Sequence, residues 1–297
     1  MNTLAEISRA LTTVENRKDG YLDLLDKLYK QGKPSKVIGV TGAPGAGKST
    51  LVDLYVNMLA GEGKKVAVIA VDPSSPFSGG ALLGDRIRMS SNSDNIFIRS
   101  VATRGAMGGV SDAVFNMIVV FRAAGYEYII IETVGVGQNE ISISKLSDLT
   151  MLVMNPGTGD DIQMMKAGIM EIGDLFVINK SDLAGADEME AFLKASFPER
   201  TEKIFRVSAR KAEGVDLLKD AIDNIYKKEA QAINKKAESI LKEGLRYLIL
   251  SEVSRNLDLA LNKADIRIQE IVTAKESPYS QMKKVLKDSL KFTEVKK

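Results

Sequence analysis

The stretch that decides the fold spans residues 37–50 and reads VIGVTGAPGAGKST. Its apolar, β-branched start, Val37–Val40, predicts a buried strand, and the apolar spacing of Ser49–Ala60 predicts a helix. Between them, Gly42–Ser49 matches the pattern G-x-x-x-x-G-K-[ST]. Glycines there let backbone N–H groups wrap a phosphate, and the helix N-terminus adds positive potential. Because the motif stands between a strand and a helix, the sequence predicts a phosphate-binding loop rather than a chance glycine-rich turn.

Individual residues of this loop have distinct expected roles. Lys48 is expected to contact the β- and γ-phosphates and to stabilise charge during their chemistry, and Ser49 is expected to ligate Mg²⁺. The set expected to hold the phosphates is Gly42, Ala43, Pro44, Gly45, Ala46, Gly47, Lys48, Ser49 and Thr50.

Outward from the loop, short apolar runs alternate with amphipathic helical stretches as far as residue 226. This alternation predicts an α/β fold, a P-loop domain with a mostly parallel sheet flanked by helices. The runs expected as strands are 37–40, 66–71, 96–98, 128–131, 149–154, 175–178 and 204–207, and the helices are expected at 48–60, 110–124, 161–171, 186–196 and 213–226.

Both ends of the chain have helical apolar spacing. Residues 3–30 form one such segment, and 228–261 predict a long helix followed by pieces at 263–274 and 278–290. We therefore expect an N-terminal helical extension at 1–33, a P-loop domain at 34–226 and a C-terminal all-α region at 227–297. The apolar stripe on 228–261 can pack internally or against a second subunit.

A second motif, Asn179-Lys180-Ser181-Asp182, follows the strand run 175–178. Ligands bind beyond the carboxyl ends of strands in open α/β sheets. The Asp182 carboxylate can accept both N1–H and N2–H₂ of guanine, whereas adenine has no such pair of donors and leaves the carboxylate unpaired. The Lys180 stem can lie on the base, and Asn179 can tie this segment to the phosphate loop. The sequence therefore predicts GTP and GDP rather than adenine nucleotides.

The segment Ser208-Ala209-Arg210 follows the last strand run. It resembles the loop of GTPases in which a backbone N–H meets guanine O6, so we expect it beside the base.

Acidic residues at strand ends are candidates for the metal and for catalysis. Asp72 and Glu132 end two strand runs, and Asp85 lies in a glycine-rich segment. Carboxylates in such places bind Mg²⁺ directly or through its waters, although Asp72 can simply form a turn and Asp85 a surface ion pair. Gly135 can bring a backbone N–H to the γ-phosphate. Further candidates are Gln138 for orienting water and Arg86, Arg88 and Arg104 for transition-state charge.

Two absences narrow the chemistry. The chain has no Cys and no His among its 297 residues, which excludes disulfides, thiol nucleophiles, imidazole bases and sites built from thiolate or imidazole ligands. A metal here needs oxygen ligands, and proton transfer needs carboxylates, Lys, Tyr or water.

Charge and hydropathy predict no contact with nucleic acid or membrane. The formal net charge is +2, too small for strong bulk attraction to polyanions. The first residues lack the apolar run of a signal peptide, and the longest apolar runs are strand-sized. We expect a cytoplasmic protein.

Together, the motifs resemble one family closely over roughly residues 36–210. The segments GAPGAGKST, VDPSSPFSGGALLGDRIRM, ETVGVGQNE, PGTGDDIQMMKAGIMEIGD and NKSD look like the methylmalonyl-CoA-mutase-associated GTPases of the MeaB/ArgK type, relatives of the metallochaperone GTPases. The resemblance implies a homodimeric chaperone for an adenosylcobalamin-dependent acyl-CoA mutase. It also implies control of cofactor loading, protection or reactivation, and slow GTP hydrolysis that the mutase stimulates.

The resemblance also carries residue roles. Lys48 and Ser49 match the phosphate and magnesium positions, Asp182 matches the guanine reader, and Asp72, Asp85 and Glu132 match the acidic set around the metal. Lys166 matches a lysine that couples nucleotide state to the mutase, whereas its own sequence context suggests only a solvated helix residue.

Other function classes remain open. A GTP-dependent or transport-associated kinase needs an acceptor pocket, and a nucleotide-gated binding module needs almost no catalysis. A targeting GTPase would need a methionine-rich domain, yet the 12 Met residues are scattered. A metallochaperone is disfavoured because Cys and His are absent.

Overall fold

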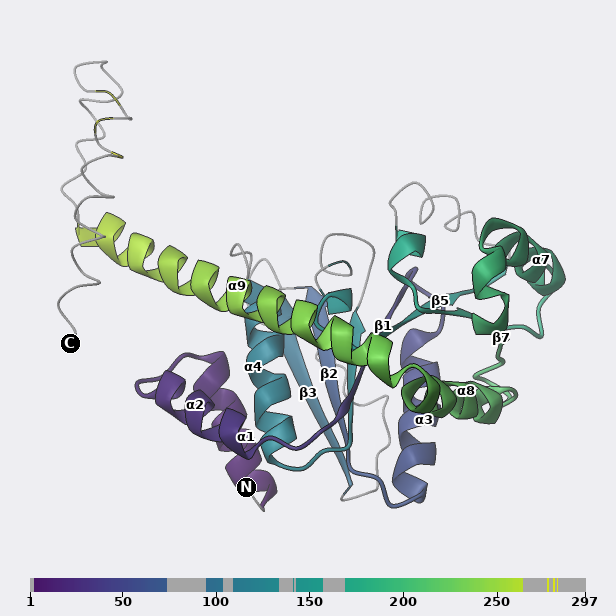
Figure 1. Ribbon diagram of the computed structural model, residues 1–297, viewed down its shortest axis with the longest axis horizontal. Helices are drawn as coiled ribbons and strands as arrows, with labels where there is room; N and C mark the ends of the chain where they lie inside the picture. Colours follow the sequence, from purple (N-terminus) through teal and green to yellow (C-terminus); the bar gives the residue numbers. More distant parts are fainter. Residues whose placement is uncertain are drawn as a thin grey trace. The chain divides into compact units, whose positions relative to one another are not determined.

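Seven parallel strands form one sheet (Figure 1). The computed structural model describes residues 3–73, 95–103, 109–133, 141, 143–156 and 169–263, together with 277, 280 and 282. The sheet order is β3-β2-β4-β1-β5-β6-β7. The strands are β1 Lys36–Gly42, β2 Val66–Pro73, β3 Ile96–Thr103, β4 Tyr128–Thr133, β5 Leu149–Met154, β6 Leu175–Ile178 and β7 Ile204–Arg206.

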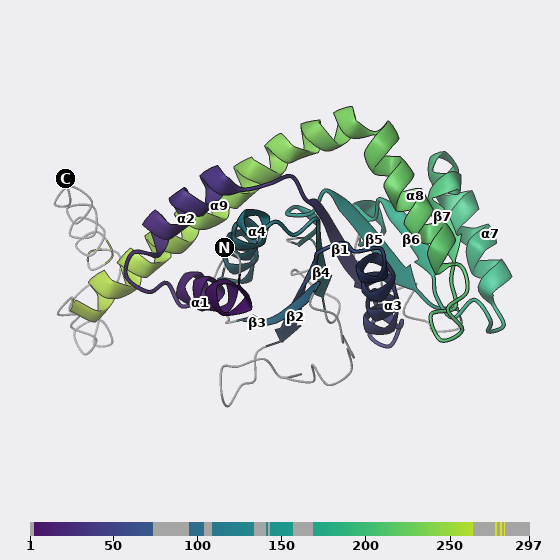
Figure 2. The ribbon, with the colours of Figure 1, turned by 90° about the horizontal axis from the view of Figure 1, so that it is seen from below.

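Helices cover both faces of this sheet. Helices α3 and α8 pack on one face, and α4 packs on the other with α1 and α2 outside it (Figures 1 and 2). The helices are α1 Leu4–Glu15, α2 Tyr21–Gln31, α3 Lys48–Gly61, α4 Gly109–Ala123, α7 Ala186–Ser196, α8 Val215–Lys228 and α9 Ala230–Lys263, with short 3-10 turns at Ile169–Ile172 and Pro198–Lys203.

The core explains the apolar runs of the sequence. Every residue of β4, β5 and β6 is buried, because strands covered on both faces expose neither set of alternating side chains to water. The predicted α/β fold with a parallel sheet is therefore confirmed, and each predicted strand run contains a strand. The predicted helix 161–171 lies mainly outside the described residues, as do almost all of 263–274 and 278–290.

The N-terminal helical segment consists of two helices, α1 and α2. The chain turns between α1 and α2, where Arg17 and Gly20 have φ values of 47° and 79°. Residues in this left-handed region cannot continue a right-handed helix. Arg17 pairs with Asp112 of α4, and Glu15 pairs with Arg99 of β3. These ion pairs join the extension to the sheet domain.

The chain divides into two compact units, Met1–Gly244 and Leu245–Lys297, so the division falls inside α9. Within the first unit, α9 packs closely on α4, since a Cβ at Gly244 would lie 2.2 Å from the Phe115 ring. Among the described helices, none has the length and apolar character needed to cross a membrane.

Candidate nucleotide-binding site

The parallel sheet brings the sequence motifs to one edge. The phosphate loop follows β1, Glu132 lies at the end of β4, Asn179 follows β6 and Ser208 comes shortly after β7. The register pairs Val40 with Glu132 and Gly42 with Val153. Because parallel strands all end on the same side, residues far apart in sequence meet at the carboxyl edge.

Two glycines of the phosphate loop are required by their surroundings. Gly42 has a φ of 145°, and a Cβ there would lie 1.9 Å from the Val153 carbonyl oxygen. Gly47 has a φ of 84°, and a Cβ there would lie 2.3 Å from Asn179 Nδ2. Any side chain at either position would both strain the backbone and collide with a neighbour.

Lys48 is held over the loop by backbone oxygens. Its Nζ donates to the Gly42 and Ala43 carbonyls at 2.8 Å each, and the residue is only 6% exposed. It is also the first residue of α3, whose N-terminus has no side-chain cap. The first N–H groups of a helix that has no side-chain cap, with a buried ammonium beside them, form a site suited to a phosphate.

Ser49 and Glu132 provide oxygen ligands next to the loop. Ser49 Oγ donates to Glu132 Oε1 at 2.5 Å, and Glu132 is buried. A hydroxyl and a carboxylate are the donor types that Mg²⁺ prefers, so these residues fit that ion. Asp72 is the last residue but one of β2, and its side chain is outside the described set. Asp85, Gly135, Gln138 and Lys166 also lie outside the described residues, as do Arg86, Arg88 and Arg104.

Asn179 joins three segments of the site. Its Nδ2 donates to the Ala46 carbonyl at 2.8 Å, and its Oδ1 accepts the Ala209 N–H at 3.0 Å. The side chain is buried. Nearby, Lys180 Nζ donates to the Gly45 carbonyl at 2.7 Å. Hydrogen bonds therefore join three segments into one unit: the phosphate loop, the NKSD segment Asn179–Asp182, and the loop that begins at Ser208.

Asp182 is held as an ionised acceptor. Ser208 Oγ donates to its Oδ1 at 2.8 Å, and Lys211 Nζ lies 3.6 Å from its Oδ2. The pKa of Asp182 is lowered, first by the Ser208 hydrogen bond and further by Lys211. A carboxylate in this state can accept two hydrogen bonds from a donor pair.

Lys211 is a site residue that the motifs did not identify. Backbone hydrogen bonds in both directions between Ser208 and Glu213 close a tight loop, with Ala212 at a φ of 56°. This loop brings the Lys211 side chain close to the Asp182 carboxylate. The one sequence signal for Lys211 was that a basic residue directly follows Ser208-Ala209-Arg210. The Arg210 side chain itself is exposed.

Comparison with known proteins identifies the family to which the chain belongs. The family model for the methylmalonyl-CoA mutase-associated GTPase MeaB matches residues 7–265. A candidate GTPase of Pyrococcus horikoshii is 39% identical over 94% of this chain and 92% of its own length. GTPase ArgK of Escherichia coli is 39% identical over 73% of this chain and 71% of its own.

Two further matches extend this result. The mitochondrial methylmalonic aciduria type A homolog of Mus musculus is 41% identical over 66% of this chain and 50% of its own length. A crystal structure described as a LAO/AO transport system kinase superposes with a TM-score of 0.67 and 26% identity, covering 95% of this chain and 92% of that one. The family model and these relatives agree with the P-loop GTPase fold, and the chain belongs to the MeaB family of methylmalonyl-CoA mutase-associated GTPases.

Proposed function

We propose that this chain is a GTP-hydrolysing chaperone of an adenosylcobalamin-dependent acyl-CoA mutase, methylmalonyl-CoA mutase or a relative. In this proposal it binds the mutase and controls loading, protection or reactivation of the cobalamin cofactor. The family's description and the name of the mouse relative support this partner. Its cytoplasmic location stays a prediction of the sequence.

One observation carries the nucleotide part of the proposal: Asn179 connects Ala46 of the phosphate loop to Ala209, with Asp182 three residues further on. A nucleotide whose phosphates lie on the loop then has its base near an ionised carboxylate. Guanine presents two adjacent donors to such a group, so we assign Asp182, Asn179, Lys180 and Ser208–Arg210 to the base.

The proposed reaction is attack of water on the γ-phosphorus of GTP. The new P–O bond forms as the bond to the β–γ bridging oxygen breaks, and GDP leaves. The Lys48 ammonium and the N–H groups of the loop stabilise the negative charge that spreads over the phosphates. Without His, the water's proton passes to a carboxylate or to phosphate itself. We assign catalytic support to Asp85 and Glu132, and coupling to the mutase to Lys166.

Ser49 and Glu132, together with Asp72 and Asp85, are the residues proposed to hold Mg²⁺. When bound, that ion would neutralise charge on the β- and γ-phosphate oxygens. The Gly135 N–H is assigned to the γ-phosphate. Among the described members of this group, Ser49 and Glu132 already lie in contact.

The proposed organisation keeps a helical extension at 1–33, a GTPase domain at 34–226 and a C-terminal region at 227–297 that forms a homodimer. Support for the dimer comes from large apolar side chains exposed on α9, among them Leu245, Ile249 and Val253. Soluble monomers rarely expose contiguous apolar stripes.

The decisive experiment measures phosphate release from GTP and from ATP with Mg²⁺, with and without the acyl-CoA mutase of the same organism. We expect slow, GTP-selective hydrolysis that rises when the mutase is added. GTP hydrolysis that ignores the mutase would remove this partner while leaving the nucleotide assignment. Preference for ATP would overturn the base assignment.

A substitution at Asp182 tests base recognition directly. Asp182→Asn replaces one acceptor by a donor, so it should weaken GTP binding by about 2 kcal/mol or more and improve xanthosine triphosphate relative to GTP. Calorimetric titration of both nucleotides measures this change. Asp220→Asn, an exposed change of the same kind on α8, is the matched control. Equal GTP affinity in both variants would exclude Asp182 from the base site.

A kinase is the second candidate, because a similar crystal structure is described as a transport system kinase. It predicts transfer of the γ-phosphate to a small acceptor instead of water. GTP radiolabelled on its γ-phosphate separates the two functions. A kinase leaves the label on the acceptor, whereas a hydrolase releases it as inorganic phosphate.

A further inference from the structure

A cavity of about 800 Å³ lies at the edge of the sheet opposite the phosphate loop. This volume is within the range of roughly 300–1,000 Å³ that small-molecule sites occupy. Lys36 and Tyr128, the first residues of β1 and β4, line it, whereas the nucleotide motifs follow the last residues of their strands. All lining residues belong to the unit Met1–Gly244.

One end of the cavity carries two cations, Lys33 and Arg122, whose side chains make no hydrogen bond or ion pair with any described residue. The backbone N–H of Lys33 donates to the backbone carbonyl of Arg122 at 3.1 Å, so the main chains of these two lining residues lie side by side. Arg122 Nε is buried and has no hydrogen-bond partner. Among the described residues, no hydrogen bond or ion pair to Lys33 Nζ is found. A buried N–H without an acceptor is unfavourable, so the Arg122 cation is not satisfied by the protein around it, and a ligand can pair with its terminal nitrogens.

The other cations of the wall are already paired. Lys36 Nζ lies 2.6 Å from Asp223, and Lys64 Nζ lies 3.0 Å from Glu127. Positive charge is therefore available only at the Lys33–Arg122 end of the cavity, as far as the described part of the chain shows.

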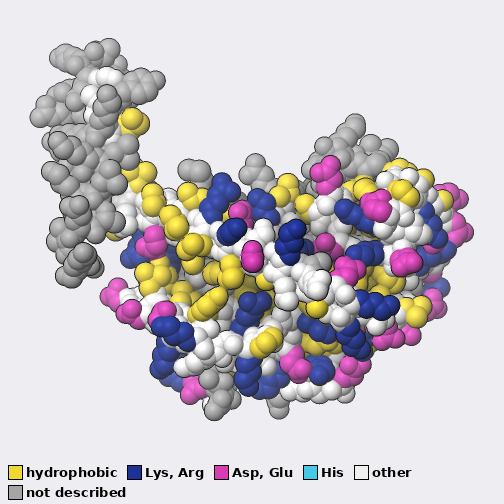
Figure 3. All heavy atoms as spheres, in the orientation of Figure 1, with side chains coloured by type: hydrophobic (Ala, Val, Ile, Leu, Met, Phe, Trp, Pro, Cys, Tyr) yellow, Lys and Arg dark blue, Asp and Glu magenta, His cyan; other side chains and the backbone are white. Residues whose placement is uncertain are grey.

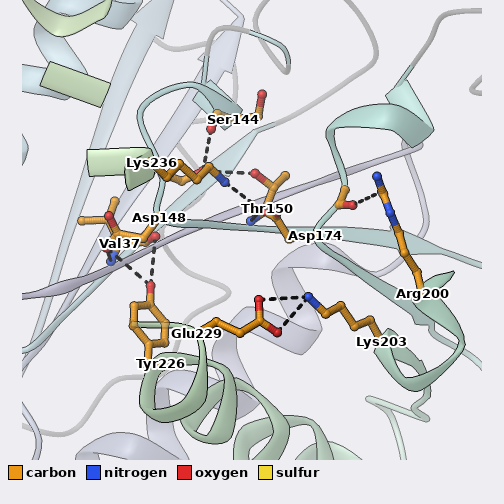
Figure 4. Close-up of polar contacts among 12 residues, drawn as sticks. Val37, Ser144, Asp148, Thr150, Asp174, Arg200, Lys203, Tyr226, Glu229 and Lys236 are labelled. Atoms are coloured by element: carbon orange, nitrogen blue, oxygen red, sulfur yellow. Dashed lines mark hydrogen bonds and ion pairs between the residues drawn. The ribbon is translucent and has the colours of Figure 1, made fainter. Parts of the chain in front are cut away.

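An acid in the wall does not satisfy Arg122. Asp148 Oδ2 accepts the Val37 N–H at 2.9 Å and the Tyr226 hydroxyl at 3.5 Å (Figure 4). Burial raises the pKa of Asp148, and the charge of Arg122 opposes that rise without a hydrogen bond between them. The hydrogen-bonded oxygen of Asp148 therefore accepts from β1, through Val37, and from α8, through Tyr226, and not from Arg122.

The rest of the cavity is apolar. Phe115 and Ile118 line it from α4, and Ile233, Ala237 and Ile240 line it from α9. The spacing of the three α9 residues places them on one helical face. The space-filling view shows hydrophobic side chains beside Lys and Arg on the face that the first half of α9 crosses (Figure 3).

We infer that this cavity binds a small molecule in which a carboxylate is joined to an apolar body. The carboxylate pairs with Lys33 and Arg122, and the apolar body packs between α4 and the first half of α9. Such a ligand gives the half-buried Arg122 guanidinium a charge-assisted partner and removes apolar surface from water at the same time. This site lies outside the nucleotide machinery, so it does not rest on the proposed function.

Competition binding on the full chain, saturated with GDP and Mg²⁺, tests the inference. The fluorescent anion 8-anilinonaphthalene-1-sulfonate is displaced by octanoate, octan-1-ol or octylammonium, which share an apolar body and differ in charge. We expect octanoate to compete at least roughly tenfold better than the other two, because charge-assisted hydrogen bonds are the strong ones. Equal competition by octan-1-ol and octanoate would overturn the assignment of an anion.

Matched variants locate the binding. Lys33→Gln, on an exposed connection, should weaken octanoate roughly tenfold and leave octan-1-ol unchanged, and Arg122→Gln should do the same. Lys65→Gln removes an exposed charge that does not line the cavity and should have no effect. Ala237→Phe should fill the cavity and weaken both ligands.

Unchanged GDP affinity and circular dichroism show that each variant is folded. If Arg122→Gln fails this check, Lys33→Gln still decides the result. Identical octanoate binding in Lys33→Gln and Lys65→Gln would overturn the site. The site would also be overturned if sedimentation showed that Ala237→Phe converts a dimer into monomers, because the cavity would then be part of an interface between two copies of the chain.

Discussion

At the scale of single residues, Gly47 shows how strongly the site constrains its sequence. Its backbone conformation favours glycine, and the Asn179 amide occupies the space that a Cβ would need. The same amide holds the phosphate loop to the NKSD segment. Glycine is therefore required at this position for two reasons: the conformation of the phosphate loop, and the close packing of that loop against the NKSD segment.

Gly47→Ala should abolish tight nucleotide binding. The left-handed conformation costs an alanine about 1–2 kcal/mol, and the displaced Asn179 loses its hydrogen bonds. GDP titration and urea unfolding measure both effects. Gly61→Ala in α3 is the control, because nothing lies within 4 Å of its Cβ and alanine favours a helix by up to about 1 kcal/mol. Native-like GDP affinity in Gly47→Ala would contradict the described geometry.

Asp148 should make stability depend on pH. Its native pKa is raised, chiefly by burial, from an ordinary value of 3.8. The native state therefore holds this proton more tightly than the unfolded state, and stability falls as pH rises from 3.8 through the native value. Asp148→Asn keeps an oxygen for the Val37 N–H and removes the titration.

Relative to the native chain, Asp148→Asn should therefore gain stability as pH rises through that window. Urea unfolding at several pH values measures the difference, and Asp220→Asn corrects for the loss of one exposed charge. A difference that stays constant with pH would contradict the raised pKa.

At the scale of elements, α9 is a long helix that contains one tightly packed glycine. Gly244 lies in the interior of Ala230–Lys263, where glycine normally weakens a helix. Its Cβ position is occupied by the Phe115 ring of α4. The close approach of two helices explains a residue that helix propensity alone disfavours.

Gly244→Ala should destabilise the chain by about 1–3 kcal/mol, because overpacking outweighs the gain of about 1 kcal/mol in propensity. Phe115→Leu should remove most of this penalty in the double variant. A double-mutant cycle from urea unfolding gives the coupling energy. Gly244→Ala that stabilises the chain with Phe115 present would show that the ring moves aside freely.

At the scale of the whole molecule, the apolar stripe of α9 predicts self-association. Leu245, Ile249 and Val253 are 57%, 54% and 58% exposed and follow each other by one helical turn. Ile249→Lys should shift sedimentation equilibrium towards monomers, because it buries a charge in the proposed dimer interface. Asp258→Lys places a lysine two and a half turns away, on the opposite face, and should leave the dimer intact. Dimers that survive Ile249→Lys would exclude this stripe.

Much of the fold and of the candidate site could be predicted from the sequence because the signals are local. Strand runs such as 149–154 are recognisable from their own residues, and the phosphate loop and NKSD segment are contiguous motifs. The ion pairs of Arg17 with Asp112 and of Glu15 with Arg99 could not be predicted, since their partners lie 95 and 84 positions apart in the chain. The return of Lys211 to Asp182 could not either, because it depends on how residues 208–213 close a loop.

The sequence by itself determined the parallel α/β fold, the phosphate loop and the family, since each follows from residue types in a fixed order along the chain. Only the tertiary structure decided which motifs touch: Asn179 between Ala46 and Ala209, and Gly244 against Phe115. It also created the cavity, whose walls come from residues between Tyr29 and Leu241. The physical reason is that such contacts depend on packing between distant segments, which leaves no local pattern in the sequence.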